Sequence, residues 1–138
     1  MKFIILVLIF NVQLVFAHGE DKYGPNNGFV RMPGAFHTEL VPNGKNKLKV
    51  FLLDIQWKNP SIVKSKLQIK YNNKIDAQCE IQDNFYNCTF PKSVNLTKKG
   101  ELKVMAEREE QKGMEVSYKL PLKLESSTPP ASGHNGHH

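Results

Sequence analysis

Few of the residue patterns that mark familiar active sites occur in this sequence. It has no Ser-His-Asp arrangement, no glycine-rich phosphate loop, and no HExxH or zinc-ribbon spacing. Without them the sequence indicates neither a hydrolase, nor a nucleotide-binding enzyme, nor a zinc enzyme. Only two cysteines and one tryptophan, Trp57, occur among the 138 residues. We therefore predict that the protein is not an enzyme.

Histidines are absent from most of the chain as well. Two lie near the start, His18 and His37, and three lie at the end, His134, His137 and His138. Because imidazole is the commonest metal-ligating side chain, candidates for metal binding are confined to the two ends of the sequence.

The charge balance is positive. Lys+Arg number 19 against 13 Asp+Glu, which gives a formal net charge of +6. The lysines are spread along predicted strand faces and are not gathered with aromatic side chains, so we exclude nucleic acid as a partner. The charge instead indicates a solvated face or contact with anionic envelope surfaces. At 40% hydrophobic residues and a mean hydropathy of −0.43, the chain is neither a disordered polyelectrolyte nor a polytopic membrane protein.

Residues 1–17 have the pattern of a secretory signal peptide: one lysine, an apolar run and a small-residue end at Ala17. A membrane span needs about 20 apolar residues, and Asn11 and Gln13 interrupt this stretch. An uncleaved signal anchor is the alternative. The prediction is a periplasmic or secreted protein with no transmembrane span after cleavage.

Cleavage after Ala17 would make His18 the first residue. Its free α-amine and the imidazole Nδ1 can then close a chelate ring on one metal ion. Such a nitrogen pair suits Cu(II), which prefers nitrogen ligands in square or tetragonal geometry. The alternative is chance, because cleavage must expose some residue.

The middle of the chain predicts an all-β domain. Short alternating apolar and polar runs are separated by turn residues, and no 3.6-residue period is sustained. We expect an immunoglobulin-like antiparallel β-sandwich of about seven strands over residues 35–125, with a disulfide hairpin. A flexible lead rich in glycine, proline and asparagine, residues 18–34, precedes it. Met105 and Met114 are expected to be packing residues.

The two cysteines fall into register across one predicted hairpin. A two-residue turn at Asp83 and Asn84 places Cys79 opposite Cys88 in a non-hydrogen-bonded pair, where side chains approach closely enough to bridge. The same register gathers apolar residues on one face. We therefore predict a structural disulfide that stabilises the fold by about 2–3 kcal/mol. A redox or metal-binding thiol pair is the alternative, and the Cys-x8-Cys spacing does not favour it.

Residues 126–138 have no apolar periodicity and are predicted to be a disordered, histidine-rich tail. His134, His137 and His138 can gather a transition metal there without fixed geometry. An expression tag is the alternative for this segment.

The first part of the predicted mature chain carries a family resemblance. Residues 24–28 read Gly-Pro-Asn-Asn-Gly, residues 34–41 read Gly-Ala-Phe-His-Thr-Glu-Leu-Val, and residues 50–54 read Val-Phe-Leu-Leu-Asp. Residues 18–60 thus resemble small exported β-sandwich domains of the YtkA-like and CopC-like copper-handling type, and adaptor segments of heavy-metal efflux systems. This family often has His-Gly-Gly where residues 26–28 read Asn-Asn-Gly, so a candidate ligand is missing here.

His37 and Glu39 project from the same face of a strand, because they are two residues apart. They can form a ligand pair, or a ligand with a carboxylate that orients it. The predicted copper site therefore consists of the amine and imidazole of His18 with His37, and with Glu39 or Met32 as an auxiliary ligand. The Met32 thioether would favour Cu(I). The alternative is that His37 and Glu39 form a hydrogen-bonded surface pair.

Two functions follow. The first is an exported copper-binding protein that buffers the ion or delivers it to an efflux or metalloprotein-assembly partner. The second is a non-metal interaction domain that binds another envelope protein through a face of the sandwich.

Overall fold

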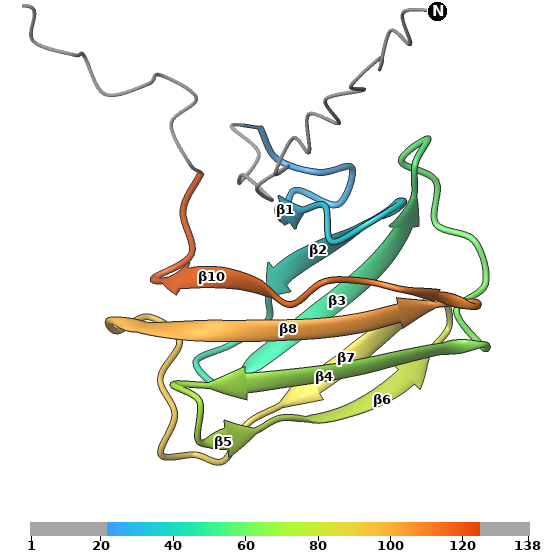
Figure 1. The fold of residues 1–138 in the computed structure, drawn as a ribbon. Coiled ribbons are helices and arrows are strands. Elements are labelled where there is room, and N and C mark those ends of the chain that lie inside the picture. The colour runs from blue at the N-terminus through green and yellow to red at the C-terminus, as the bar shows by residue number, and fades with distance from the viewer. Residues whose placement is uncertain (1–21, 125–138) are drawn as a thin grey trace, which may run out of the picture.

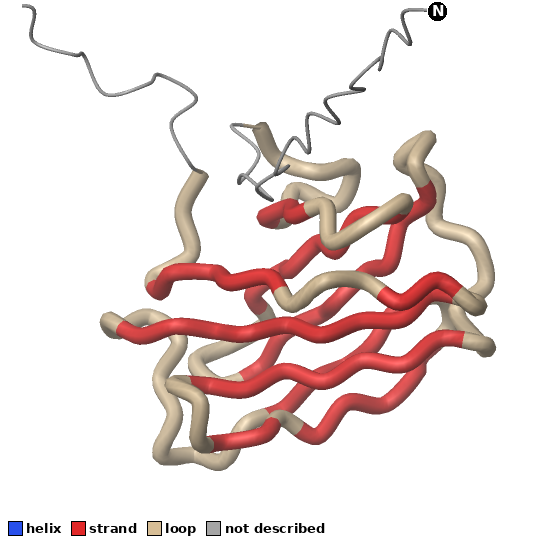
Figure 2. The backbone as a smooth tube through the Cα atoms, viewed as in Figure 1, coloured by secondary structure: helices blue, strands red, loops and turns tan. Residues whose placement is uncertain are grey.

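The computed structural model describes residues 22–124, and these form strands and turns without a helix (Figures 1 and 2). The strands make two antiparallel sheets that pack face to face. The first sheet has the order β1 (Phe29–Arg31), β2 (Phe36–Pro42), β3 (Lys47–Asp54), β7 (Phe85–Thr89) and β6 (Gln78–Gln82). The second has the order β10 (Val116–Leu120), β8 (Gly100–Arg108), β4 (Ser65–Tyr71) and β5 (Ile75–Asp76), with β9 (Gln111–Lys112) paired to β8.

The order of the strands is that of an immunoglobulin-like sandwich. Seven strands have five residues or more, and they divide into β2-β3-β7-β6 and β10-β8-β4. This is the A-B-E-D and G-F-C arrangement of the constant-type immunoglobulin fold. The predicted fold class is therefore confirmed. Strands β1, β5 and β9 are short additions at the sheet margins.

Alternating side chains build the core between the sheets. The inward side chains Leu48, Val50 and Leu52 of β3 are buried, and so are Leu102, Val104 and Ala106 of β8. Successive side chains of a strand point to opposite faces, so this alternation directs one apolar set inward. Burying each such side chain contributes about 1.5–3 kcal/mol relative to exposure.

A polar link joins the two sheets within this core. The Tyr118 hydroxyl of β10 lies 2.7 Å from Thr38 Oγ1 of β2, and it donates to the Thr38 carbonyl oxygen at 3.0 Å. Burial raises the pKa of Tyr118 well above its usual range. The guanidinium of Arg31 lies 4.5 Å above the Tyr118 ring, and its Nε donates to the Ser117 carbonyl oxygen. These contacts attach β1 to β10 at the margin of the sandwich.

The predicted disulfide hairpin is confirmed. Strands β6 and β7 pair with Gln82 opposite Phe85 and Cys79 opposite Cys88, and the turn falls at Asp83 and Asn84. The two cysteines form a disulfide, with their Cα atoms 4.0 Å apart. The bridge lies within one sheet and does not join the two sheets.

The start of the sandwich differs from the prediction. Residues 18–34 were expected to form a flexible lead, but Phe29–Arg31 is a strand paired with β2. The described sandwich therefore begins before residue 35. No helix in residues 22–124 is long and apolar enough to cross a bilayer. The predicted signal peptide and histidine-rich tail lie outside the described residues.

Candidate functional site

His37 and Glu39 both lie on the outward side of β2, as the strand spacing predicts. Phe36, Thr38 and Leu40 face the core, and His37 and Glu39 point the other way, opposite Leu53 and Phe51 of β3. Neither side chain is exposed despite this outward position. His37 is 4% exposed and Glu39 is 0% exposed. Each is covered by a different segment of the chain.

One ring nitrogen of His37 is engaged by the backbone. Nδ1 lies 3.0 Å from the carbonyl oxygen of Asp54. Because a carbonyl oxygen can only accept, Nδ1 carries the hydrogen. In the neutral imidazole Nε2 then keeps its lone pair, which is the form that binds a metal ion. The structure thus selects one tautomer of His37.

The indole of Trp57 covers one face of the His37 ring. The two rings stack with centroids 3.8 Å apart and planes 18° apart. Stacking occupies the face of an imidazole and leaves its edge, where Nε2 lies, outside the contact. Trp57 is itself 40% exposed.

A tight turn after β3 places this indole. The Asp54 carboxylate accepts the backbone N–H groups of Gln56 and Lys58, both at 2.9 Å, and the Asp54 carbonyl oxygen accepts that of Trp57. Trp57 has φ of 66°, a left-handed conformation that is rare for a bulky residue. Strain of this kind persists only where the surroundings hold it. Asp54 therefore organises both the turn and the imidazole. No local sequence pattern predicts that Trp57 meets His37.

Glu39 is bound by the loop that precedes β1. Its Oε1 accepts the backbone N–H of Asn26 at 2.8 Å and of Gly28 at 2.9 Å, and its Oε2 accepts Nδ2 of Asn26 at 2.9 Å. The loop is closed by the N–H of Gly24, which donates to the Gly28 carbonyl oxygen. We call this arrangement the Glu39 clamp.

Glycine is required at both ends of the clamped loop. A Cβ on Gly24 would lie 2.5 Å from the Glu39 carboxylate, and a Cβ on Gly28 would lie 2.7 Å from Glu39 Cγ. Any larger residue would push the loop away from the carboxylate. The motif formed by residues 24–28 and Glu39 therefore has a structural explanation.

The alternative of a hydrogen-bonded surface pair is wrong. His37 and Glu39 are buried, and they bond separately, His37 to Asp54 and Glu39 to the loop. Both Glu39 oxygens are already engaged, so the predicted auxiliary ligand serves here as a structural clamp. The expectation of packing roles for Met105 and Met114 is also wrong, because both are exposed, Met114 by 60%.

Met32 is exposed in the loop between β1 and β2, near the end of the sandwich that carries His37. Its neighbour Pro33 accepts the backbone N–H of Met114 at 2.9 Å. The predicted ligands His18, His134, His137 and His138 lie outside the described residues. Within residues 22–124, no three His, Cys, Asp or Glu side chains gather as a metal site would require.

Exposed apolar side chains mark the same end of the sandwich. This end, which we call the histidine end, is formed by loops 32–35, 55–64 and 83–84 and by segment 109–115, which includes β9 (Figure 1). In antibody variable domains the loops after strands B and F lie at one end and belong to the antigen-binding loops. The histidine end holds the exposed side chains of Met32, Ile55, Trp57, Val63 and Met114.

Comparison of the chain with protein-family models, with curated proteins and with solved structures gives no match. The resemblance to copper-handling domains therefore stays a prediction.

Proposed function

We propose that the chain is an exported copper-binding protein whose ion is held at the histidine end of the sandwich. His37 supplies Nε2, and His18 supplies its imidazole and, after cleavage, its α-amine. The observation that carries this proposal is the hydrogen bond from His37 Nδ1 to the Asp54 carbonyl oxygen. Metal-ligating histidines commonly donate their second N–H to a carbonyl or carboxylate, which fixes the tautomer and the ring.

The Glu39 clamp supports the participation of His18. It holds Gly24 against Glu39, which lies two residues from His37 on the same face of β2. Two residues along a strand span about 7 Å. Gly24 lies six positions after His18, and an extended segment of that length spans up to about 20 Å. The new N-terminus would therefore reach the edge of the His37 ring. In this proposal Glu39 anchors the lead and is not a ligand.

The donor types favour copper. Two imidazoles and an amine suit Cu(II), and the exposed Met32 thioether would add a soft ligand for Cu(I). The three tail histidines supply a second site. The protein buffers copper outside the cytoplasm or passes it to an efflux or assembly partner.

Copper titration of the exported protein tests this site, and the stacked indole supplies the readout. Trp57 is the only tryptophan of the chain, and it lies in contact with His37. Cu(II) bound at His37 should therefore quench the tryptophan fluorescence with a stoichiometry of one ion per chain.

The informative variant is His37→Asn. The asparagine amide can still donate to the Asp54 carbonyl oxygen, whereas it has no nitrogen lone pair to replace Nε2. We expect the quenching by Cu(II) to disappear, and affinity for the first ion to fall by about 10–100-fold or more. A tail variant with His134, His137 and His138 replaced by Ala is the control and should keep the quenching. Equal quenching in His37→Asn and the wild type would refute the site, and N-terminal sequencing that gives a start other than His18 would remove the amine ligand.

A second candidate function is a non-metal interaction domain. The observation that favours it is the group of exposed apolar side chains at the histidine end. The binding surface would then be this end of the sandwich, whereas the sequence led us to expect a sheet face. Large exposed apolar patches on soluble proteins commonly mark partner-binding sites. Two results together would support this function. The wild type would bind no copper at His37, and the Trp57→Ala variant would no longer bind the protein partner of the wild type.

A further inference from the structure

Lysines gather at the end of the sandwich opposite the histidine end. This basic end is formed by loops 43–46, 72–74 and 90–99 and by segment 121–124 (Figure 1). These segments contain six lysines and no acidic residue, and all six lysines are exposed. They are Lys45, Lys74, Lys92, Lys98, Lys99 and Lys123.

Backbone hydrogen bonds hold three of the loops of the basic end in place. Loop 43–46 is tied to loop 90–99 by the N–H of Phe90, which donates to the Asn46 carbonyl oxygen, and by that of Leu96, which donates to the Lys45 carbonyl oxygen. Asn72 donates its N–H to the Glu101 carbonyl oxygen at the start of β8. The lysines are therefore displayed on a preformed scaffold.

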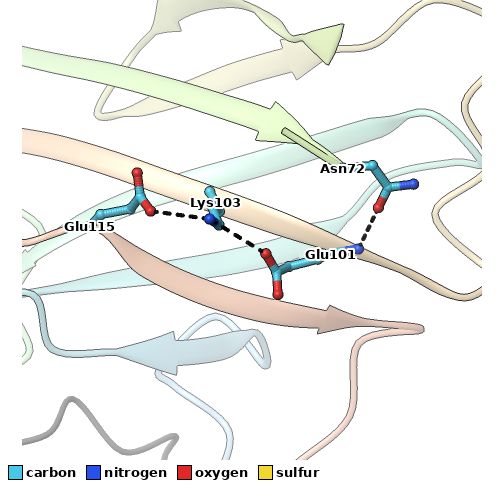
Figure 3. A network of polar contacts seen from close by, with 4 residues as sticks. All are labelled: Asn72, Glu101, Lys103 and Glu115. Atoms are coloured by element: carbon cyan, nitrogen blue, oxygen red, sulfur yellow. Dashed lines mark hydrogen bonds and ion pairs between the residues drawn. The ribbon is translucent and has the colours of Figure 1, made fainter. Parts of the chain in front are cut away.

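One carboxylate at this end, that of Asp76 in β5, lies two positions after Lys74 and accepts a hydrogen bond from Gln68. Within the described part of the chain none of the six lysines forms an ion pair. The nearest acidic residue in β8, Glu101, pairs instead with Lys103, which also contacts Glu115 (Figure 3). Its backbone N–H donates to Asn72 Oδ1 in the same network.

The opposite end has no such excess. The loops of the histidine end contain three lysines and four acidic residues. The lysines are Lys58, Lys64 and Lys112, and the acidic residues are Asp83, Glu109, Glu110 and Glu115. Positive charge is thus concentrated at one end of the molecule and is not a general property of its surface.

The chemistry of the basic end fits a lipid surface better than a nucleic acid or an apolar groove. Among residues 22–124 the exposed large apolar side chains all lie elsewhere, so the basic end offers no ring for stacking and no wedge for insertion. Lysine ammonium groups act as mobile point charges that suit a diffuse array of headgroups. Juxtamembrane lysine clusters bind anionic lipids in this way.

We propose that the basic end docks the protein on an anionic lipid surface, with the histidine end turned away from the bilayer. The orientation follows from the opposed positions of the two ends (Figure 1). It would leave the His37 and Trp57 region accessible to ions and partners. The inference does not depend on copper binding, because the six lysines lie in loops at the opposite end from His37, which belongs to β2.

Vesicle partitioning of the exported protein tests the docking surface. We expect binding to phosphatidylcholine vesicles that contain phosphatidylglycerol, and none to phosphatidylcholine alone, at a pH of about 8 where imidazoles are neutral. Binding should vanish in about 1 M salt, where the Debye length is about 3 Å. Each lysine at such a surface contributes roughly a fivefold factor, so the triple variant K92E/K98E/K99E should bind at least about 100-fold more weakly.

The matched control reverses three exposed lysines at the histidine end, K58E/K64E/K112E. It changes the net charge by the same amount as K92E/K98E/K99E, and it should lower partitioning into the vesicles by less than about tenfold. Equal weakening in the two triple variants would show a general charge effect and overturn the docking surface. The docking surface would also be overturned if the wild type bound equally to vesicles with and without phosphatidylglycerol, or if it bound a soluble polyanion but no vesicles. Circular dichroism of both variants verifies that each is folded.

Discussion

At the scale of single residues, Glu39 has a role that is set by its neighbours. A buried carboxylate is costly unless its oxygens accept hydrogen bonds, and Glu39 receives three, from Asn26 and Gly28. The bonds tie the segment before β1 to the outer side of β2. His37, two residues away, is fixed instead by the Asp54 carbonyl oxygen and by the Trp57 indole. Two neighbouring outward positions of β2 therefore make different contacts: Glu39 holds the preceding loop, and His37 contacts the turn after β3.

Replacing Glu39 by Gln tests the clamp. The amide group of glutamine would present N–H donors toward Asn26 Nδ2, which is itself a donor, and the charge-assisted bonds would be lost. We expect the free energy of unfolding to fall by about 1.5–3 kcal/mol, with faster hydrogen exchange at the amides of Asn26 and Gly28. Glu101→Gln, at an exposed ion pair, is the control and should change stability by less than about 1 kcal/mol. Unchanged exchange at Asn26 and Gly28 would contradict the clamp.

At the scale of elements, the β6–β7 hairpin depends on its turn and its pairing. Tyr86 and Cys88 of β7 are buried, while Ile81 of β6 is exposed because β6 lies at the sheet edge. The register set by this turn places Cys79 opposite Cys88. The disulfide therefore reinforces a register that local sequence already favours.

The double variant Cys79→Ala/Cys88→Ala measures this reinforcement. We expect the free energy of unfolding to fall by about 2–3 kcal/mol from the lost chain constraint, with a similar β-sheet signal in circular dichroism. Denaturant unfolding of the variant and the oxidised wild type checks it, with the reduced wild type as the matched control. A variant as stable as the oxidised protein would show that the bridge contributes nothing to stability.

At the scale of the whole molecule, the two sheets are joined by the Tyr118 hydroxyl and Thr38. The pKa of Tyr118 is raised in the folded protein because burial disfavours the phenolate. Above a pH of about 10 the unfolded chain loses this proton while the folded protein keeps it. Stability therefore declines as the pH rises from there toward the folded pKa, and below a pH of about 10 this contribution is fully present.

Tyr118→Phe separates this contribution from other alkaline effects. We expect the variant to lose about 1–2 kcal/mol at neutral pH through the missing hydrogen bonds. Above a pH of about 10 the stability of the variant should fall less steeply than that of the wild type. The difference between the two slopes should be up to about 1.4 kcal/mol per pH unit. Chemical denaturation over a pH series measures both effects. Tyr23→Phe, at an exposed position, should match the wild type, and parallel alkaline slopes in wild type and Tyr118→Phe would contradict the assignment.

Some features of this molecule are determined locally and were therefore readable from the sequence. Alternation of apolar residues selects strands, because side chains of a strand alternate between faces. The two-residue turn at Asp83 and Asn84 determines the register that joins Cys79 to Cys88. The shared face of His37 and Glu39 follows from their spacing alone.

Other features arise from segments distant in the sequence, and only the tertiary structure decided them. The loop at Asn26 reaches Glu39, the turn after Asp54 brings Trp57 onto His37, and β1 joins the sheet within a segment expected to be flexible. The separation of a basic end from a histidine end is also a product of folding. Lysines dispersed along the chain become one surface because antiparallel strands return their alternate loops to the same end of the sandwich.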